Sequence, residues 1–98
     1  MLICIDYDGT YTEDPLLWSM FIVQAKNKNH KVICCTMRYE KSEGDEVKMY
    51  LEGLVDKIYF TEREAKKKYL SNLGIFPKIW IDDMPELLFY DTKPTEEL

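Results

Sequence analysis

The sequence predicts one α/β domain in which a parallel sheet of about four strands lies between helices. Short apolar runs, rich in β-branched residues, alternate with longer helical stretches along the 98-residue chain. The runs are continuous rather than alternating, which is typical of strands buried on both faces. Helical stretches, not tight hairpin turns, connect these runs. The strands are therefore expected to run parallel, with helices on both faces of the sheet.

The first half of the chain predicts two strands and one helix. Leu2–Ile5 (LICI) is the first expected strand. Asp14 suits the N-cap position and Pro15 the first turn, so a helix is expected over Leu16–Lys26. The turn formers NKNH end this helix, and Lys31–Cys35 (KVICC) is the second expected strand.

A second helix is expected to follow, with an early boundary marked by Gly44. One face of it carries apolar residues at helical spacing, namely Val47, Tyr50, Leu51 and Leu54. Lys57–Phe60 (KIYF) is the third expected strand.

The sequence TERE predicts a capping box, with Thr61 as the cap and Glu64 three residues later. It should open a third helix that ends at Gly74. The residues expected on its buried face are Ala65, Tyr69 and Leu73. Lys78–Ile81 (KIWI) is the fourth expected strand, and a short helix should follow Pro85.

Composition indicates an ordinary globular chain, with 46% hydrophobic and 32% charged residues. Residues 1–90 are expected to form the one domain and residues 91–98 a polar, frayed tail. The formal net charge of −5 disfavours extended nucleic-acid binding.

Cysteine usage favours a reducing, cytoplasmic environment. Cys4, Cys34 and Cys35 lie in apolar runs and form no C-x-x-C pair, so we expect reduced, buried thiols. The N-terminus lacks the features of a secretory signal, and no apolar run approaches the length that spans a membrane.

Polar residues follow three of the expected strands. They are Asp6 and Asp8, Thr36 and Arg38, and Asp82 and Asp83. Parallel strands bring their carboxyl ends to one edge of the sheet, where such a cluster of carboxylates needs a cation. Oxygen ligands without His or Cys favour Mg²⁺. Taken singly, the Asp-Gly pair could instead be a hairpin turn, and the IDD sequence a solvated turn.

These residues resemble the motifs of the haloacid-dehalogenase-like phosphohydrolases. Asp6-Tyr7-Asp8-Gly9-Thr10 matches their D-x-D-G-T motif, and Thr36 the hydroxyl residue that ends the next strand. A Lys on a later helix and the acidic pair in WIDDMPE complete the order. The resemblance implies a three-layer Rossmann-like fold and a Mg²⁺-dependent phosphatase.

The resemblance also implies roles for individual residues. Asp6 would be the nucleophile that forms an aspartyl phosphate, and Asp8 the general acid and base. Thr36 would bond a phosphoryl oxygen. Only one of the consecutive residues Lys66, Lys67 and Lys68 can face the site. The spacing to YLSNLGI in similar sequences favours Lys67 as the catalytic Lys, with Lys66 the second choice.

The resemblance places Mg²⁺ on the Asp6 carboxylate, on the Asp8 backbone carbonyl and on an acid after the last strand. Asp83 is the expected direct ligand, with Asp82 beside it or in the next shell. Substrate contacts are expected from the Gly9 and Thr10 loop, whose N–H groups can cradle a phosphoryl group, and from Arg38. A solvated Arg38 is an equal alternative.

The spacing leaves no room for a cap domain, since only YTED separates Thr10 from Pro15. An open site suits a nucleotide, a polynucleotide end or another exposed phosphate, unless a second subunit of a homo-oligomer supplies a lid. The expected partner is a phosphorylated substrate, which could be a small molecule, a nucleotide or the end of a macromolecule. Two other functions fit the residue types. One is a receiver-type phospho-acceptor module, although its motif order differs. The other is a catalytically degenerate binding protein on the same fold.

Overall fold

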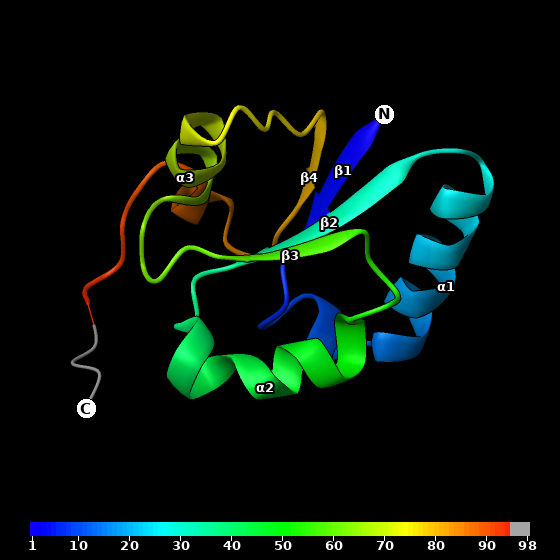
Figure 1. Cartoon of the computed structure of the whole chain (residues 1–98), viewed down its shortest axis with the longest axis horizontal. Coiled ribbons are helices and arrows are strands. Elements are labelled where there is room, and N and C mark those ends of the chain that lie inside the picture. Colours follow the sequence, from blue (N-terminus) through cyan, green and yellow to red (C-terminus); the bar gives the residue numbers. More distant parts are fainter. Residues whose placement is uncertain (95–98) are drawn as a thin grey trace.

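The computed structural model describes residues 1–94, and its elements follow the predicted order (Figure 1). The elements are β1 (Leu2–Ile5), η1 (Tyr11–Glu13, a 3₁₀ helix), α1 (Pro15–Asn27), β2 (Lys31–Thr36), α2 (Glu40–Leu51), β3 (Lys57–Phe60), α3 (Lys66–Asn72), β4 (Ile79–Ile81) and η2 (Pro85–Leu88, a 3₁₀ helix).

The four strands form one all-parallel sheet in the order β3-β2-β1-β4. The register places Ile5 of β1 beside Cys34 of β2 and Ile81 of β4. α1 and α2 cover one face of the sheet and α3 covers the other, as Figure 1 shows. The predicted α/β class, the parallel sheet and the three layers are therefore confirmed.

Each face of the sheet has its own apolar core. Ile22 of α1 and Val47 of α2 pack on the face that carries Ile5 and Cys34. On the other face, Leu70 of α3 packs with residues that include Cys4 and Cys35. All three cysteines are free and buried, as predicted.

The second helix begins earlier than predicted. α2 starts at Glu40, where the Glu43 carboxylate accepts a hydrogen bond from the Tyr39 N–H at 2.8 Å. Gly44 is buried inside the helix rather than at its boundary, and a Cβ there would lie 3.2 Å from the Phe60 ring. A close approach of helix to sheet, not a helix end, therefore explains this glycine.

The predicted capping box is wrong, because α3 starts at Lys66 rather than after Thr61. The Thr61 hydroxyl donates to the Glu64 carbonyl oxygen at 2.8 Å and caps no helix. Glu62 and Arg63 between them have left-handed φ values of 55° and 77°, which interrupts any helical start.

The buried face of α3 also differs from the prediction. Lys66 and Leu70 are its buried residues, whereas Leu73 is 55% exposed. Ala65 is buried as predicted, but it precedes the helix as its N-cap residue. With the later start, Lys66 replaces Lys67 on the face toward the sheet.

The tail is anchored at its beginning, which corrects the expectation of a frayed segment. The Asp91 carboxylate accepts a hydrogen bond from the Ala65 N–H at 2.7 Å, and the Thr92 N–H donates to the Arg63 carbonyl at 2.9 Å. Residues 95–98 of the predicted tail lie outside the described residues.

No cap domain interrupts residues 1–94, as the spacing predicted. The connection from β1 to α1 contains only η1, and residues 61–65 link β3 to α3. Within the described part of the chain, no helix has both the length and the apolar character needed to cross a membrane.

Candidate functional site

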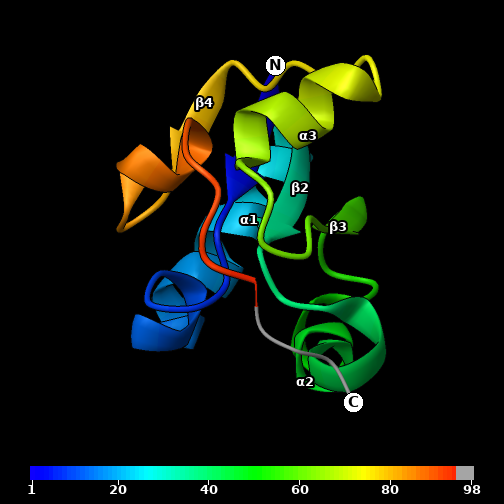
Figure 2. The same cartoon turned by 90° about the vertical axis from the view of Figure 1, so that its left-hand side faces the viewer.

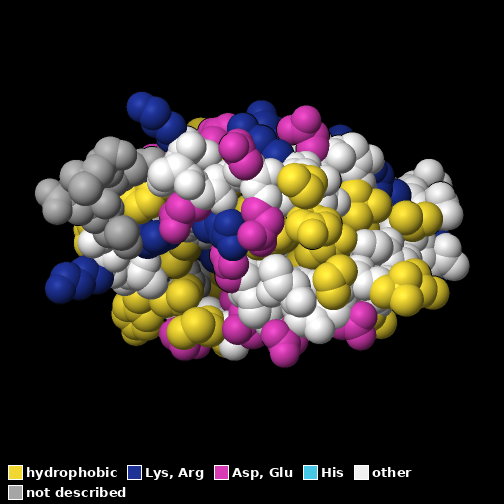
Figure 3. Space-filling view, turned by 90° about the horizontal axis from the view of Figure 1, so that it is seen from below, with side chains coloured by type: hydrophobic (Ala, Val, Ile, Leu, Met, Phe, Trp, Pro, Cys, Tyr) yellow, Lys and Arg dark blue, Asp and Glu magenta, His cyan; other side chains and the backbone are white. Residues whose placement is uncertain are grey.

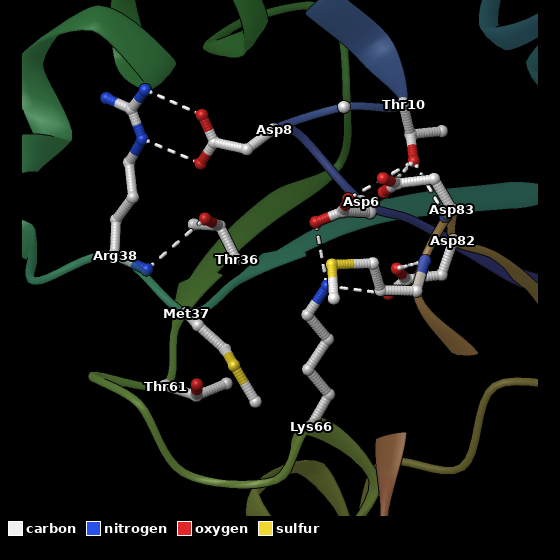
Figure 4. A network of polar contacts seen from close by, with 12 residues as sticks. Asp6, Asp8, Thr10, Thr36, Met37, Arg38, Thr61, Lys66, Asp82 and Asp83 are labelled. Carbon is white, nitrogen blue, oxygen red and sulfur yellow. Dashed lines mark hydrogen bonds and ion pairs between the residues drawn. The ribbon is translucent and has the colours of Figure 1, made fainter. Parts of the chain in front are cut away.

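The candidate site lies where the direction of strand succession reverses. β1, β2 and β3 follow one another toward one edge of the sheet, and β4 returns to the other side of β1. Such a reversal leaves a crevice beyond the carboxyl ends of the strands. Asp6 follows β1 here, Asp82 and Asp83 follow β4, and Lys66 opens α3 (Figure 4).

Lys66 forms the centre of the site. Its Nζ lies 2.7 Å from Asp6 Oδ1 and 2.6 Å from Asp82 Oδ2. The side chains of these three residues are only 4–8% exposed. Burial disfavours the ammonium, but the two carboxylates outweigh it and raise the pKa of Lys66 above its ordinary value. Lys66 is therefore a buried, charged lysine.

The negative charge of the carboxylates at Asp6 exceeds the positive charge of Lys66. Burial raises the pKa of Asp6, the nearby Asp82 and Asp83 carboxylates also raise it, and Lys66 opposes them, so that the resulting pKa is about 7. The Thr10 hydroxyl lies 3.1 Å from Asp6 Oδ2 and 3.0 Å from Asp83 Oδ1, and it also accepts from the Asp83 N–H. Thr10 thus ties the two strand ends together.

The absence of a side chain at Gly9 leaves the space that the Asp83 carboxylate occupies. Its φ is +78°, and an added Cβ would collide with the Asp83 carboxylate. Partial burial opposes ionisation of Asp83, but hydrogen bonds from Asp6 and Thr10 outweigh it and lower its pKa. A glycine at this turn is required both by the backbone conformation and by the close acid.

Asp8 points away from this cluster toward Arg38 (Figure 4). Arg38 Nε lies 2.9 Å from Asp8 Oδ2, and Arg38 Nη2 lies 2.8 Å from Asp8 Oδ1, which is a bidentate pair. The Asp8 side chain is 55% exposed, so the pair lies at the mouth of the site.

Arg38 is held by a second set of contacts that sequence reasoning missed. Its guanidinium lies 5.1 Å from the centre of the Tyr7 ring and donates to the Glu43 carbonyl oxygen at 2.9 Å. Glu46 accepts from Arg38 at 3.4 Å and from the Tyr7 hydroxyl at 2.6 Å. The alternative of a solvated Arg38 is therefore wrong, and binding of substrate by Arg38 stays a prediction.

These side chains line a cavity of about 490 Å³. Five acidic residues contribute to its lining, namely Asp6, Asp8, Glu43, Asp82 and Asp83. Three basic residues contribute, namely Arg38, Arg63 and Lys66. Because acids outnumber bases, the cavity in its fully ionised form would repel a phosphate dianion unless a further cation bound.

The structure brings most of the predicted site residues together, with two corrections. Lys67, the predicted catalytic lysine, lies over the Phe89 ring at 5.5 Å, and Lys66 takes the place expected for it. The Gly9 and Thr10 N–H groups are not free to cradle a phosphoryl group, because they donate to the Thr12 hydroxyl and the Tyr7 carbonyl oxygen.

Thr36 lies at the predicted place, buried at the end of β2 and in the cavity lining. Its Oγ accepts a hydrogen bond from the Arg38 N–H at 3.3 Å. Glu43 and Arg63 were not predicted. They form an ion pair of 3.2 Å inside the lining, and Arg63 also donates to the Met37 carbonyl oxygen at 2.7 Å. Arg63 was not predicted as a site residue because it belongs to the TERE sequence, which was interpreted as a capping box.

The donor set fits a hard divalent cation. Asp6, Asp82 and Asp83 each offer a carboxylate oxygen, and these oxygens lie within 4.8 Å of one another. Oxygen donors alone, with no His or Cys among them, suit Mg²⁺. Asp83 is the most available of the three, because it is exposed, whereas Lys66 binds both Asp6 Oδ1 and Asp82 Oδ2.

No protein-family model, curated protein or solved structure matches the chain. The likeness to the haloacid-dehalogenase-like phosphohydrolases therefore depends on the motif residues and on the geometry described above.

Replacement of Lys66 should destabilise the metal-free protein far more than replacement of Lys67. Lys66→Met leaves Asp6 and Asp82 buried without their cation, which should lower the free energy of unfolding by about 3–5 kcal/mol. Lys67 is exposed, so Lys67→Met should change it by about 0.5 kcal/mol or less. Urea denaturation in EDTA measures both, and similar losses for the two variants would contradict the assignment.

The stability of the metal-free protein should carry a pH dependence from Asp6. The folded protein holds the Asp6 proton up to about pH 7, whereas an unfolded chain releases it near the ordinary Asp pKa of about 4. The contribution of Asp6 to stability should therefore fall as the pH rises from about 4 to 7. Asp6→Asn removes this titration, so the stability of wild type relative to the variant should decline over that interval. A constant difference would contradict the raised pKa.

Proposed function

We propose that the chain is a Mg²⁺-dependent phosphomonoester hydrolase that acts through an aspartyl phosphate on Asp6. One observation carries the proposal: Asp6 lies buried at the switch point, bonded to the buried Lys66 ammonium and beside two further carboxylates. A carboxylate with a purely structural role would not need two further acids beside it. A nucleophilic carboxylate would, because those acids bind the cation that lets it attack a phosphate.

The proposed reaction has two steps. An Asp6 oxygen attacks phosphorus, the bond from phosphorus to the leaving oxygen breaks, and protonated Asp8 gives its proton to that oxygen. Water then attacks the phosphorus of the aspartyl phosphate and gives a proton to Asp8. The bond from phosphorus to the Asp6 oxygen breaks, so phosphate leaves and the Asp6 carboxylate is restored. Asp8 is paired with Arg38 in this structure, so proton transfer requires that pair to open.

The chain's own residues prepare this reaction. Lys66 neutralises charge next to the nucleophile and fixes its orientation, and Thr36 offers a hydroxyl in the same cavity. Asp6 and Asp83 would be direct ligands of Mg²⁺. Asp82 would either bind the ion as well or lie next to its direct ligands. When bound, the ion would supply the positive charge that lets an anionic nucleophile approach a phosphate dianion.

The cavity favours an exposed phosphate as substrate. No inserted domain covers it within the described residues, and the Asp8–Arg38 pair at its mouth is accessible to solvent. We therefore propose a nucleotide, a polynucleotide end or another exposed phosphate group as substrate. A small metabolite would need a lid from a second subunit.

A phospho-acceptor module is the second candidate function. The observation that favours it is the bidentate pair with Arg38, which directs the Asp8 carboxylate away from Asp6. Without a base near the aspartyl phosphate, the modification would persist rather than turn over.

Mg²⁺ should raise the melting temperature of the protein, because it neutralises the acidic cluster. Asp83→Ala should remove most of this rise. Asp45→Ala is a matched control, since Asp45 is an exposed acid outside the cavity. A rise in Asp83→Ala equal to that of the wild type would exclude Asp83 as a principal ligand.

Repeated turnover should separate the hydrolase from the acceptor module. With Mg²⁺ and excess phosphomonoester, drawn from a panel of nucleotides and 3′- or 5′-phosphorylated oligonucleotides, the wild type should release many phosphates per chain. Asp8→Ala should lose about 10²–10⁴-fold in kcat, and Asp6→Asn nearly all activity. Uptake of a single phosphoryl group that lasts for minutes, in wild type and Asp8→Ala alike, would favour the acceptor module.

A further inference from the structure

We propose that Asp91 is a positioning residue for the candidate active site, because it fixes the start of α3 and so the place of the Lys66 ammonium. Asp91 and Thr92 together are called the strap here. The proposal about catalysis rests on the proposed function, whereas the proposal about the position of Lys66 does not.

The segment that the strap holds has an unfavourable backbone. Residues 61–65 lead from β3 to α3, and both Glu62 and Arg63 adopt left-handed φ values that non-glycine residues rarely take. Such a conformation persists only where the surroundings enforce it. Contacts with neighbouring segments must therefore hold residues 61–65 in this conformation.

One side of the loop is held by the last residue of β2 and by the residue that follows it. The Thr61 N–H donates to the Thr36 carbonyl oxygen at 2.8 Å, and the Arg63 N–H donates to the Met37 carbonyl oxygen at 3.0 Å. These bonds continue the pairing of β2 with β3 beyond the sheet. They leave the carbonyl of Arg63 and the N–H of Ala65 to other partners.

The strap binds these two groups. The Thr92 N–H donates to the Arg63 carbonyl oxygen at 2.9 Å, and Asp91 Oδ1 accepts from the Ala65 N–H at 2.7 Å. The Thr92 hydroxyl also lies 3.5 Å from Met37 Sδ. The strap runs beside the loop before α3, as the red trace in Figures 1 and 2 shows.

The position of Lys66 follows directly from the Asp91 contact. Ala65 is the N-cap residue of α3 and makes no side-chain cap of its own, so Asp91 supplies the acceptor at this helix start. Lys66 is the next residue, and its Nζ must reach both Asp6 and Asp82. A shift of the first helical turn would move this ammonium away from the carboxylates.

Chemical labelling tests the position of Lys66 without any activity assay. The full-length protein is treated briefly with N-acetoxysuccinimide, and acetylation of Lys66, Lys67 and Lys68 is quantified by fragment mass spectrometry. In the wild type, buried Lys66 should react at least tenfold more slowly than its two exposed neighbours. Asp91→Ala should remove most of this protection, and Asp91→Asn, which retains an acceptor oxygen, should restore it.

Asp56→Ala is the matched control. The Asp56 carboxylate also accepts a hydrogen bond from a backbone N–H, that of Val32 at 2.7 Å, but at the beginning of β2 and away from the site. This variant loses that bond and an ion pair of 3.8 Å with Lys26, and it should keep Lys66 protected. Protection that is unchanged in Asp91→Ala, or lost equally in Asp56→Ala, would overturn the positioning role.

Steady-state kinetics with the same variants test the consequence for catalysis. Displacement of Lys66 should lower kcat about 10- to 100-fold in Asp91→Ala with a smaller change in KM, since misplacement by about 1 Å can have such an effect. Asp91→Asn and Asp56→Ala should remain within about threefold of the wild type. An inactive wild type with the expected labelling pattern would refute the hydrolase and leave the strap intact. An active enzyme with unchanged kcat in Asp91→Ala would refute the catalytic role of the strap.

Discussion

The ion pair of Lys66 with Asp6 and Asp82 is the interaction on which the candidate site depends. A buried ammonium is tolerated only where carboxylates surround it, so the ends of β1 and β4 and the start of α3 must meet at one point. The fold provides this meeting point because β4 returns to the side of β1 that β2 does not occupy. The order of the strands and the position of the α3 start therefore together bring these charges into contact.

The same cluster contains more acid than its own cation can balance. Asp6 responds by keeping a proton up to about pH 7, and Thr10 and Gly9 allow Asp83 to come close despite its charge. A fold selected for stability alone would gain by replacing one of these acids. The proposed function would account for this excess of acid, because a bound divalent cation would supply the missing positive charge.

The site has two ionic clusters that differ in exposure. The Lys66 cluster is buried, whereas the Asp8–Arg38 pair lies at the mouth, where solvent weakens ion pairs (Figure 4). Figure 3, which views the molecule from below, shows acidic and basic side chains next to one another and beside hydrophobic ones. In the proposed hydrolase, the buried cluster would hold the nucleophile in place, and the exposed pair would open for proton transfer.

The sequence by itself determined the strands, the parallel sheet and the edge at which Asp6, Thr36 and Asp83 gather, because apolar runs and strand ends are local features of the chain. The tertiary structure decided which lysine enters the site. The start of α3 is set by left-handed residues after β3 and by Asp91, which is 26 residues from the Ala65 N–H that it binds. A shift of one residue rotates a helix by about 100°, so Lys66 replaces Lys67. No local pattern contains that contact, and for the same physical reason the pairing of Asp8 with Arg38, 30 residues away, became visible only in the folded chain.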